Sequence, residues 1–95
     1  MKKLDIREVT GLINKLEEKF KGLDINSDEV RENVLNDFSE IKEVLRKNPS
    51  DERIIERLKL FLRELQDNSY GNKNLNSLIY DLEEFIKKAD ITSDF

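Results

Sequence analysis

The feature that most constrains this 95-residue chain is a stripe of apolar residues at helical spacing, which occurs in four separate segments. Side chains three or four positions apart lie on one face of an α-helix, because each residue advances about 100° around the axis. In the first segment, residues 5–21, the stripe fills an arc of roughly 120°, the width of a helix face that packs on a core. Its members, with one residue beyond the segment, are Ile6, Val9, Leu12, Ile13, Leu16, Phe20 and Leu23. The spacing therefore predicts an amphipathic helix.

Residues 27–47 form the second predicted helix. Asn26 is its expected N-cap, and Glu29 three residues later would complete a capping box. The apolar stripe consists of Val30, Val34, Leu35, Phe38, Ile41 and Leu45. Pro49 then keeps Asn48 out of helical geometry, so the chain is expected to turn there.

The third and fourth predicted helices, residues 51–66 and 75–88, repeat one apolar pattern 24 positions apart. Ser50 and Asn74 are their expected N-caps. The matching pairs are Ile54 and Leu78, Ile55 and Ile79, Leu58 and Leu82, Phe61 and Phe85, Leu62 and Ile86, and Leu65 and Ala89. Any helix that buries one face needs this spacing, so the repeat indicates shared packing rather than a duplicated functional unit. The last residues, 90–95, are expected to be frayed.

Four helices joined by short loops predict a single all-α domain spanning residues 1–95, folded as a small antiparallel four-helix bundle. A three-helix bundle with one broken helix is the alternative. Gly22 is expected to end the first helix in the left-handed conformation. Gly11 lies inside that helix, where the missing side chain would let a neighbouring helix approach closely.

Composition removes several kinds of chemistry. The chain has no histidine and no cysteine. It therefore lacks the commonest general base, a thiolate nucleophile and the usual zinc ligands. Its three glycines are too far apart to form a phosphate-binding loop. We therefore predict no catalytic residues, no cofactor and no enzymatic activity.

The closest approach to a metal-binding pattern is "DINSDE" at residues 24–29. Asp24, Asn26 and Asp28 match the first three side-chain ligands of an EF-hand loop. Glu29, however, stands where that loop needs glycine, and Leu35 stands where it needs glutamate. The segment is better explained as a helix start, and no metal site is predicted.

Charged residues make up 40% of the chain, but opposite signs are mixed and the net charge is only −4. With regularly spaced apolar residues, this mixture favours a folded chain with solvated helix faces over disorder. The expected ion pairs within helices are Glu17–Lys21, Glu43–Lys47, Glu83–Lys87 and Glu84–Lys88. The basic residues of the third helix alternate with acidic ones, so they form no stripe that would attract nucleic acid.

No apolar run approaches the roughly 18 residues that a membrane span needs. The amino-terminal residues "MKKLDIREV" do not predict a secretory signal. These features, together with the lack of cysteine, predict a cytoplasmic protein.

Four apolar side chains are not needed by the predicted core. Leu60 and Tyr80 lie off their stripes, Tyr70 lies in the longest loop, and Phe95 is the last residue. Exposed tyrosine is a favoured interface anchor, although scattered exposed apolar residues are also ordinary. We therefore predict that Leu60, Tyr70, Tyr80 and Phe95 contact a partner protein.

The predicted role is that of an inhibitor, an immunity or antitoxin-type protein, a phage-encoded modulator or a regulatory adaptor. A self-assembling helical module that forms a homodimer is the alternative. A weak DNA-binding transcriptional regulator is the second alternative.

Overall fold

The computed structural model describes the backbone of residues 4–93 and the side chains of residues 4–89. Four α-helices and one short 3-10 turn make up the described chain. They are α1 (Ile6–Lys21), α2 (Asp28–Arg46), α3 (Asp51–Asn68), η1 (Lys73–Leu75) and α4 (Asn76–Ser93). None of the described helices is long and apolar enough to cross a membrane.

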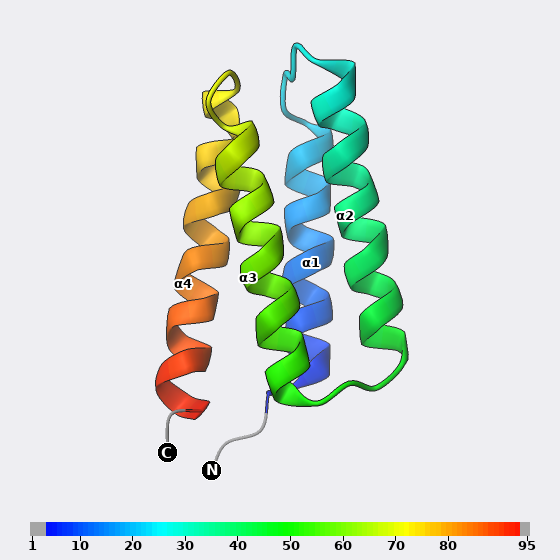
Figure 1. Ribbon diagram of the computed structural model, residues 1–95, viewed down its shortest axis with the longest axis vertical. Helices are drawn as coiled ribbons and strands as arrows, with labels where there is room; N and C mark the ends of the chain where they lie inside the picture. Colours follow the sequence, from blue (N-terminus) through cyan, green and yellow to red (C-terminus); the bar gives the residue numbers. More distant parts are fainter. Residues whose placement is uncertain (1–3, 94–95) are drawn as a thin grey trace.

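The helices lie side by side and alternate in direction, so α1 begins and α4 ends at the same end of the bundle (Figure 1). Each helix contacts the next one along the chain, and α4 also contacts α1. The molecule is elongated, with dimensions of 43 × 24 × 18 Å. This arrangement confirms the predicted antiparallel four-helix bundle over the three-helix alternative.

The four apolar stripes meet in one core between the helices. The buried apolar side chains are Val9, Ile13, Leu16, Phe20, Ile25, Val34, Phe38, Ile41, Ile54, Ile55, Leu58, Phe61, Leu65, Leu75, Leu78, Leu82, Ile86 and Ala89. Among the described side chains, none that is polar or charged is buried. Phe38 is central, because its ring lies 6.1 Å from that of Phe20 and 4.9 Å, edge to face, from that of Phe61. Burying one such side chain contributes about 1.5–3 kcal/mol.

Side-chain caps begin three of the helices. The Asp5 carboxylate accepts a hydrogen bond from the Arg7 N–H at 2.9 Å before α1. Ser50 was predicted to cap α3, and its hydroxyl accepts a bond from the Arg53 N–H at 3.3 Å. The predicted cap of α2 is wrong by one residue.

At α2, Ser27 rather than Asn26 is the N-cap, and its hydroxyl accepts a bond from the Val30 N–H at 3.3 Å. Ser27 has the extended backbone that a cap requires. The shift by one residue also removes the predicted capping box, because Glu29 then occupies the second helical position rather than the third.

The left-handed residue lies at a different turn from the one predicted. Gly22 has φ −87°, in the right-handed region, and α1 closes instead through a bond from the Gly22 N–H to the Lys19 carbonyl at 3.2 Å. Asn48 has φ 53° before Pro49. Proline excludes helical geometry from the residue before it, and asparagine tolerates the left-handed region. Gly11 is exposed, and a Cβ there would meet no described atom within 4 Å, so the predicted close approach is wrong.

The start and end of α4 also differ from prediction. Asn74 lies inside η1, and its amide donates to the Asp24 carbonyl at 2.8 Å, which ties together two turns at one end of the bundle. The helix then continues to Ser93 instead of ending near Lys88. Residues 90–93 are therefore helical rather than frayed, because the sequence contains no glycine or proline after Gly71 that would stop the helix.

Candidate functional site

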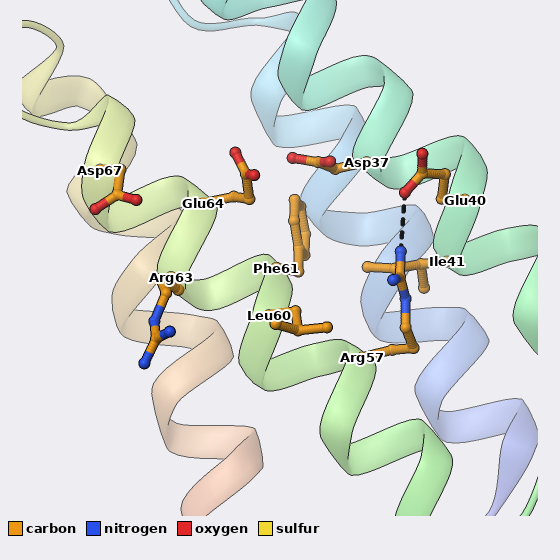
Figure 2. Close-up of a pocket in the computed structure, with 9 residues that line it drawn as sticks. All are labelled: Asp37, Glu40, Ile41, Arg57, Leu60, Phe61, Arg63, Glu64 and Asp67. Carbon is orange, nitrogen blue, oxygen red and sulfur yellow. Dashed lines mark hydrogen bonds and ion pairs between the residues drawn. The ribbon is translucent and has the colours of Figure 1, made fainter.

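A cleft of about 210 Å³ opens along the seam between α2 and α3. Six of its nine lining residues are charged, and the other three are apolar (Figure 2). The lining residues are Asp37, Glu40 and Ile41 of α2, and Arg57, Leu60, Phe61, Arg63, Glu64 and Asp67 of α3. Pockets for small-molecule ligands usually have volumes of about 300–1,000 Å³. This cleft has room for a side chain rather than for a whole metabolite.

The apolar part of the cleft is an extension of the core. Ile41 and Phe61 are 2% and 3% exposed and belong to the central cluster. Leu60 is adjacent to Phe61 but is 46% exposed. The predicted exposure of Leu60 is confirmed, and the structure places this side chain in a hollow rather than on a convex helix face.

Two carboxylates face each other across the seam, Asp37 from α2 and Glu64 from α3 (Figure 2). The pKa of Asp37 is raised from 3.8 to about 6, chiefly by burial and also by the negative charges of Glu64 and Glu40, while the positive charge of Arg57 opposes the rise. The Asp37 Oδ2 atom is shielded from solvent and has no hydrogen-bond partner among the described residues. A half-buried carboxylate is therefore held at the seam without a cation of its own.

Asp37 was not among the predicted site residues. A signal was present, because Asp37 lies three positions after Val34 and four before Ile41, both of which are buried. Residues at these separations share a helix face. A polar residue at this spacing from two stripe members is therefore expected to lie at the edge of the core.

An ion pair at this seam joins Arg57 of α3 to Glu40 of α2. The Arg57 guanidinium donates to Glu40 Oε2 at 2.9 Å. Arg57 Nε has no hydrogen-bond partner within the described part of the chain. Exposed ion pairs of this kind contribute only about 0–1 kcal/mol, so little free energy is needed to rearrange this one.

A second, more open hollow of about 360 Å³ adjoins the cleft on the far side of this ion pair. Its lining residues are Ser39, Glu40, Glu43, Val44 and Arg57. Because Glu40 and Arg57 line both hollows, the two adjoin each other along α2 and α3 and are treated together as one groove. We call it the α2–α3 groove.

Acidic side chains outnumber basic ones in this groove. Five carboxylates line it, against the two guanidinium groups of Arg57 and Arg63. Arg57 is engaged by Glu40, and Figure 2 shows Arg63 directed away from Asp37 and Glu64. The charged side chains of the groove therefore carry a net negative charge, beside apolar surface that includes Leu60. Among the described residues, no group of three or more acidic side chains is placed to hold a metal ion.

The other predicted partner-binding residues lie elsewhere. Tyr80 is 63% exposed on α4, and Tyr70 is 90% exposed in the turn between α3 and η1. Phe95 is outside the described residues. The predicted exposure of the two tyrosines is confirmed, but the structure does not bring them together with Leu60 in the groove.

Two of the ion pairs predicted within helices form with other partners. Glu43 pairs with Arg46 of its own helix at 3.2 Å rather than with Lys47. Glu17 of α1 accepts a bond from Lys42 of α2 rather than from Lys21. Lys19 of α1 pairs with Asp81 of α4 at 2.9 Å. In a bundle, a residue beside the stripe is as close to the neighbouring helix as to the next turn of its own. Charged residues at these positions therefore connect helices.

Comparisons of the chain with protein-family models, with curated proteins and with solved structures gave no match. Inferences about function accordingly rest on the geometry and charge of the molecule itself.

Proposed function

We propose that this protein is a non-enzymatic binding protein, which acts by docking another protein against the α2–α3 groove. The observation that supports this most is Leu60, an apolar side chain left 46% exposed in a hollow between charged walls. An apolar anchor surrounded by polar residues is the usual arrangement at the centre of a protein interface. A partner side chain that covered Leu60 would extend the core already formed by Ile41 and Phe61.

The dimensions of the groove favour a protein over a small molecule. Its deeper part is smaller than most metabolite sites, and its second part is broad and open. A helix or loop of a partner can bury an elongated groove of this kind with several side chains at once. The absence of histidine and cysteine further favours binding over catalysis.

Such a binding protein would serve as an inhibitor, an immunity or antitoxin-type protein, or a regulatory adaptor. We propose a cytoplasmic location, which the absence of cysteine favours.

The test is affinity capture from the native cell, followed by reconstitution with the purified captured protein. Three baits are compared: the wild type, Leu60→Ser and Tyr80→Ser. Both substitutions change exposed residues, so thermal unfolding of all three baits should agree within a few degrees. We expect Leu60→Ser to lose the captured protein and Tyr80→Ser to keep it.

Equal capture by all three baits would show that the groove is not the docking site. Direct binding that fails to reappear with purified components would overturn the binding function. A further outcome is that the captured protein is a second copy of this chain, with light scattering showing a dimer that Leu60→Ser abolishes. In that case, formation of a homodimer replaces docking of a different protein as the function.

A further inference from the structure

Resting on the proposed function, we propose that the occupant of the α2–α3 groove is a basic amphipathic helix of the partner. One arginine of that helix lies between the carboxylates of Asp37 and Glu64. An apolar side chain of the same helix packs on Leu60.

Charge complementarity at the seam supports an arginine. Asp37 and Glu64 face each other from opposite helices (Figure 2), and both side chains line the cleft. A guanidinium group presents several donors in one plane and can satisfy carboxylates on two sides. Arg57 does not fill this role, because its guanidinium donates to Glu40.

The spacing of the acceptor and the apolar patch supports a helix. Leu60 and Glu64 are four residues apart on α3, so their side chains lie one turn apart on the same face. A partner helix that carries leucine and arginine three or four positions apart presents matching groups at a similar separation, about 5–6 Å. An extended strand alternates its side chains between two faces and does not offer this pair as closely.

Other occupants fit the charge less well. Nucleic acid would bring phosphates against five carboxylates, with little counterion release to favour binding. A second copy of this chain would bring a net charge of −4 toward an acidic groove.

Affinity for such a helix depends on pH through Asp37. The charged groups that act on Asp37 are Glu64 and Arg57 of α3 and Glu40 of its own helix, and its pKa is raised to about 6. The ionised carboxylate attracts arginine and the protonated one does not. Binding is therefore strongest above pH 6 and weakens as the pH falls through 6. Bound arginine in turn lowers the pKa of Asp37 and releases a proton.

The experiment uses the ¹⁵N-labelled full chain and a synthetic helical peptide with leucine and arginine one turn apart. A matched peptide carries glutamine in place of arginine. Addition of the arginine peptide should shift the amide signals of Asp37, Ile41, Leu60 and Glu64. The glutamine peptide should bind roughly tenfold more weakly. No shift in the groove at millimolar arginine peptide, or equal binding of both peptides, would overturn the inference.

Variants of the chain locate the cation. Asp37→Asn should weaken binding of the arginine peptide roughly tenfold, and Glu64→Gln roughly threefold because Glu64 is more exposed. Glu56→Gln is the matched control, since it removes one exposed negative charge from α3 outside the groove lining. Equal weakening by Glu56→Gln and Glu64→Gln would indicate only a general effect of net charge and would contradict an arginine between Asp37 and Glu64.

The same variants separate this inference from the proposed function. A captured natural partner whose binding depends on Leu60 but not on Glu64, Asp37 or pH would leave the docking function intact and overturn the basic helix. A partner that depends on Glu64 and Asp37 and loses affinity between pH 7.5 and pH 5 supports both. If no natural partner depends on Leu60, the proposed function fails first.

Discussion

Helices α3 and α4 bury the same apolar register, 24 positions apart, yet they differ along the flank that meets the neighbouring helix. Arg57 of α3 forms an ion pair across its seam with Glu40 of α2 at 2.9 Å. Its counterpart, Asp81 of α4, forms one across the other seam with Lys19 of α1, also at 2.9 Å. At this position each helix forms an ion pair with a neighbouring helix, but α3 contributes the positive charge and α4 the negative one.

Three residues further along, the two flanks diverge. α3 carries Leu60 and α4 carries Glu84 at the equivalent position. Leu60 is an exposed apolar side chain in the α2–α3 groove, whereas Glu84 is a charged side chain that is partly buried. The shared core pattern therefore does not fix which residues occupy the flanking positions. A binding surface can arise where the two helices carry different residues at those positions.

The largest expected effect is on stability and concerns the core positions. Phe61 of α3 is 3% exposed and contacts Phe38, whereas its counterpart Phe85 of α4 is partly buried against the core. Phe61→Ala should lower the free energy of unfolding by about 3–5 kcal/mol, because it leaves a cavity beside Phe38. Phe85→Ala should lower it by about 1–3 kcal/mol. Urea unfolding followed by circular dichroism measures both, and equal losses would show that the two helices are buried to the same depth.

The next effect concerns Asp37 and the pH dependence of stability. The pKa of Asp37 is raised in the folded protein to about 6, above its ordinary value of 3.8. The folded state therefore holds a proton more tightly than the unfolded state. The ionised carboxylate of Asp37 destabilises the fold above pH 6, and this penalty disappears as the pH falls below about 4.

Asp37→Asn should consequently raise the free energy of unfolding at pH 7.5 by about 1 kcal/mol, a figure reduced to allow for solvent screening of this half-buried group. At pH 4 the gain should vanish. Urea unfolding at both pH values checks this, with Glu56→Gln as a variant that changes charge on an exposed surface. A gain of the same size at both pH values would mean that the variant acts through packing.

A smaller effect compares the two equivalent ion pairs. Arg57→Gln and Asp81→Asn should each lower the free energy of unfolding by no more than about 1 kcal/mol. Arg57 also opposes the rise in the pKa of Asp37. In Arg57→Gln that pKa should therefore move above 6, and in Asp81→Asn it should stay where it is. Carboxyl ¹³C titration by NMR distinguishes the two variants, and an unchanged pKa of Asp37 in Arg57→Gln would separate the ion pair from the carboxylates of the groove.

The bundle and Leu60 could be predicted from the sequence because apolar periodicity determines which face of a helix is buried. Leu60 breaks that periodicity, so its exposure followed directly. Ile25 could not be found in this way, since it lies in the α1–α2 turn, outside any stripe, and is nevertheless 5% exposed. Its burial depends on how that turn folds back over the core.

The groove itself was missed because its walls come from two helices. Glu17 illustrates the general difficulty: it bonds to Lys42 of α2, although Lys21 lies one turn away on its own helix. The wheel of one helix shows which residues flank its stripe, but the register between helices decides what those residues meet. Asp37 and Glu64 face each other only because α2 and α3 pack at this particular register (Figure 2).

The smallest expected effect on stability is the one most informative about function. Leu60→Glu gives α3 the residue that α4 carries at the equivalent position. Because Leu60 is 46% exposed, the free energy of unfolding should change by less than about 0.5 kcal/mol. Binding of the partner, in contrast, should be lost, since the apolar contact is replaced by a charge without a partner in the interface. The reverse substitution, Glu84→Leu, should leave both stability and binding nearly unchanged, because Glu84 does not line either hollow of the α2–α3 groove. Calorimetry with the captured partner, alongside urea unfolding, measures the pair. Retained binding by Leu60→Glu would mean that the difference between α3 and α4 at this position is surface variation, and that the partner docks elsewhere on the bundle.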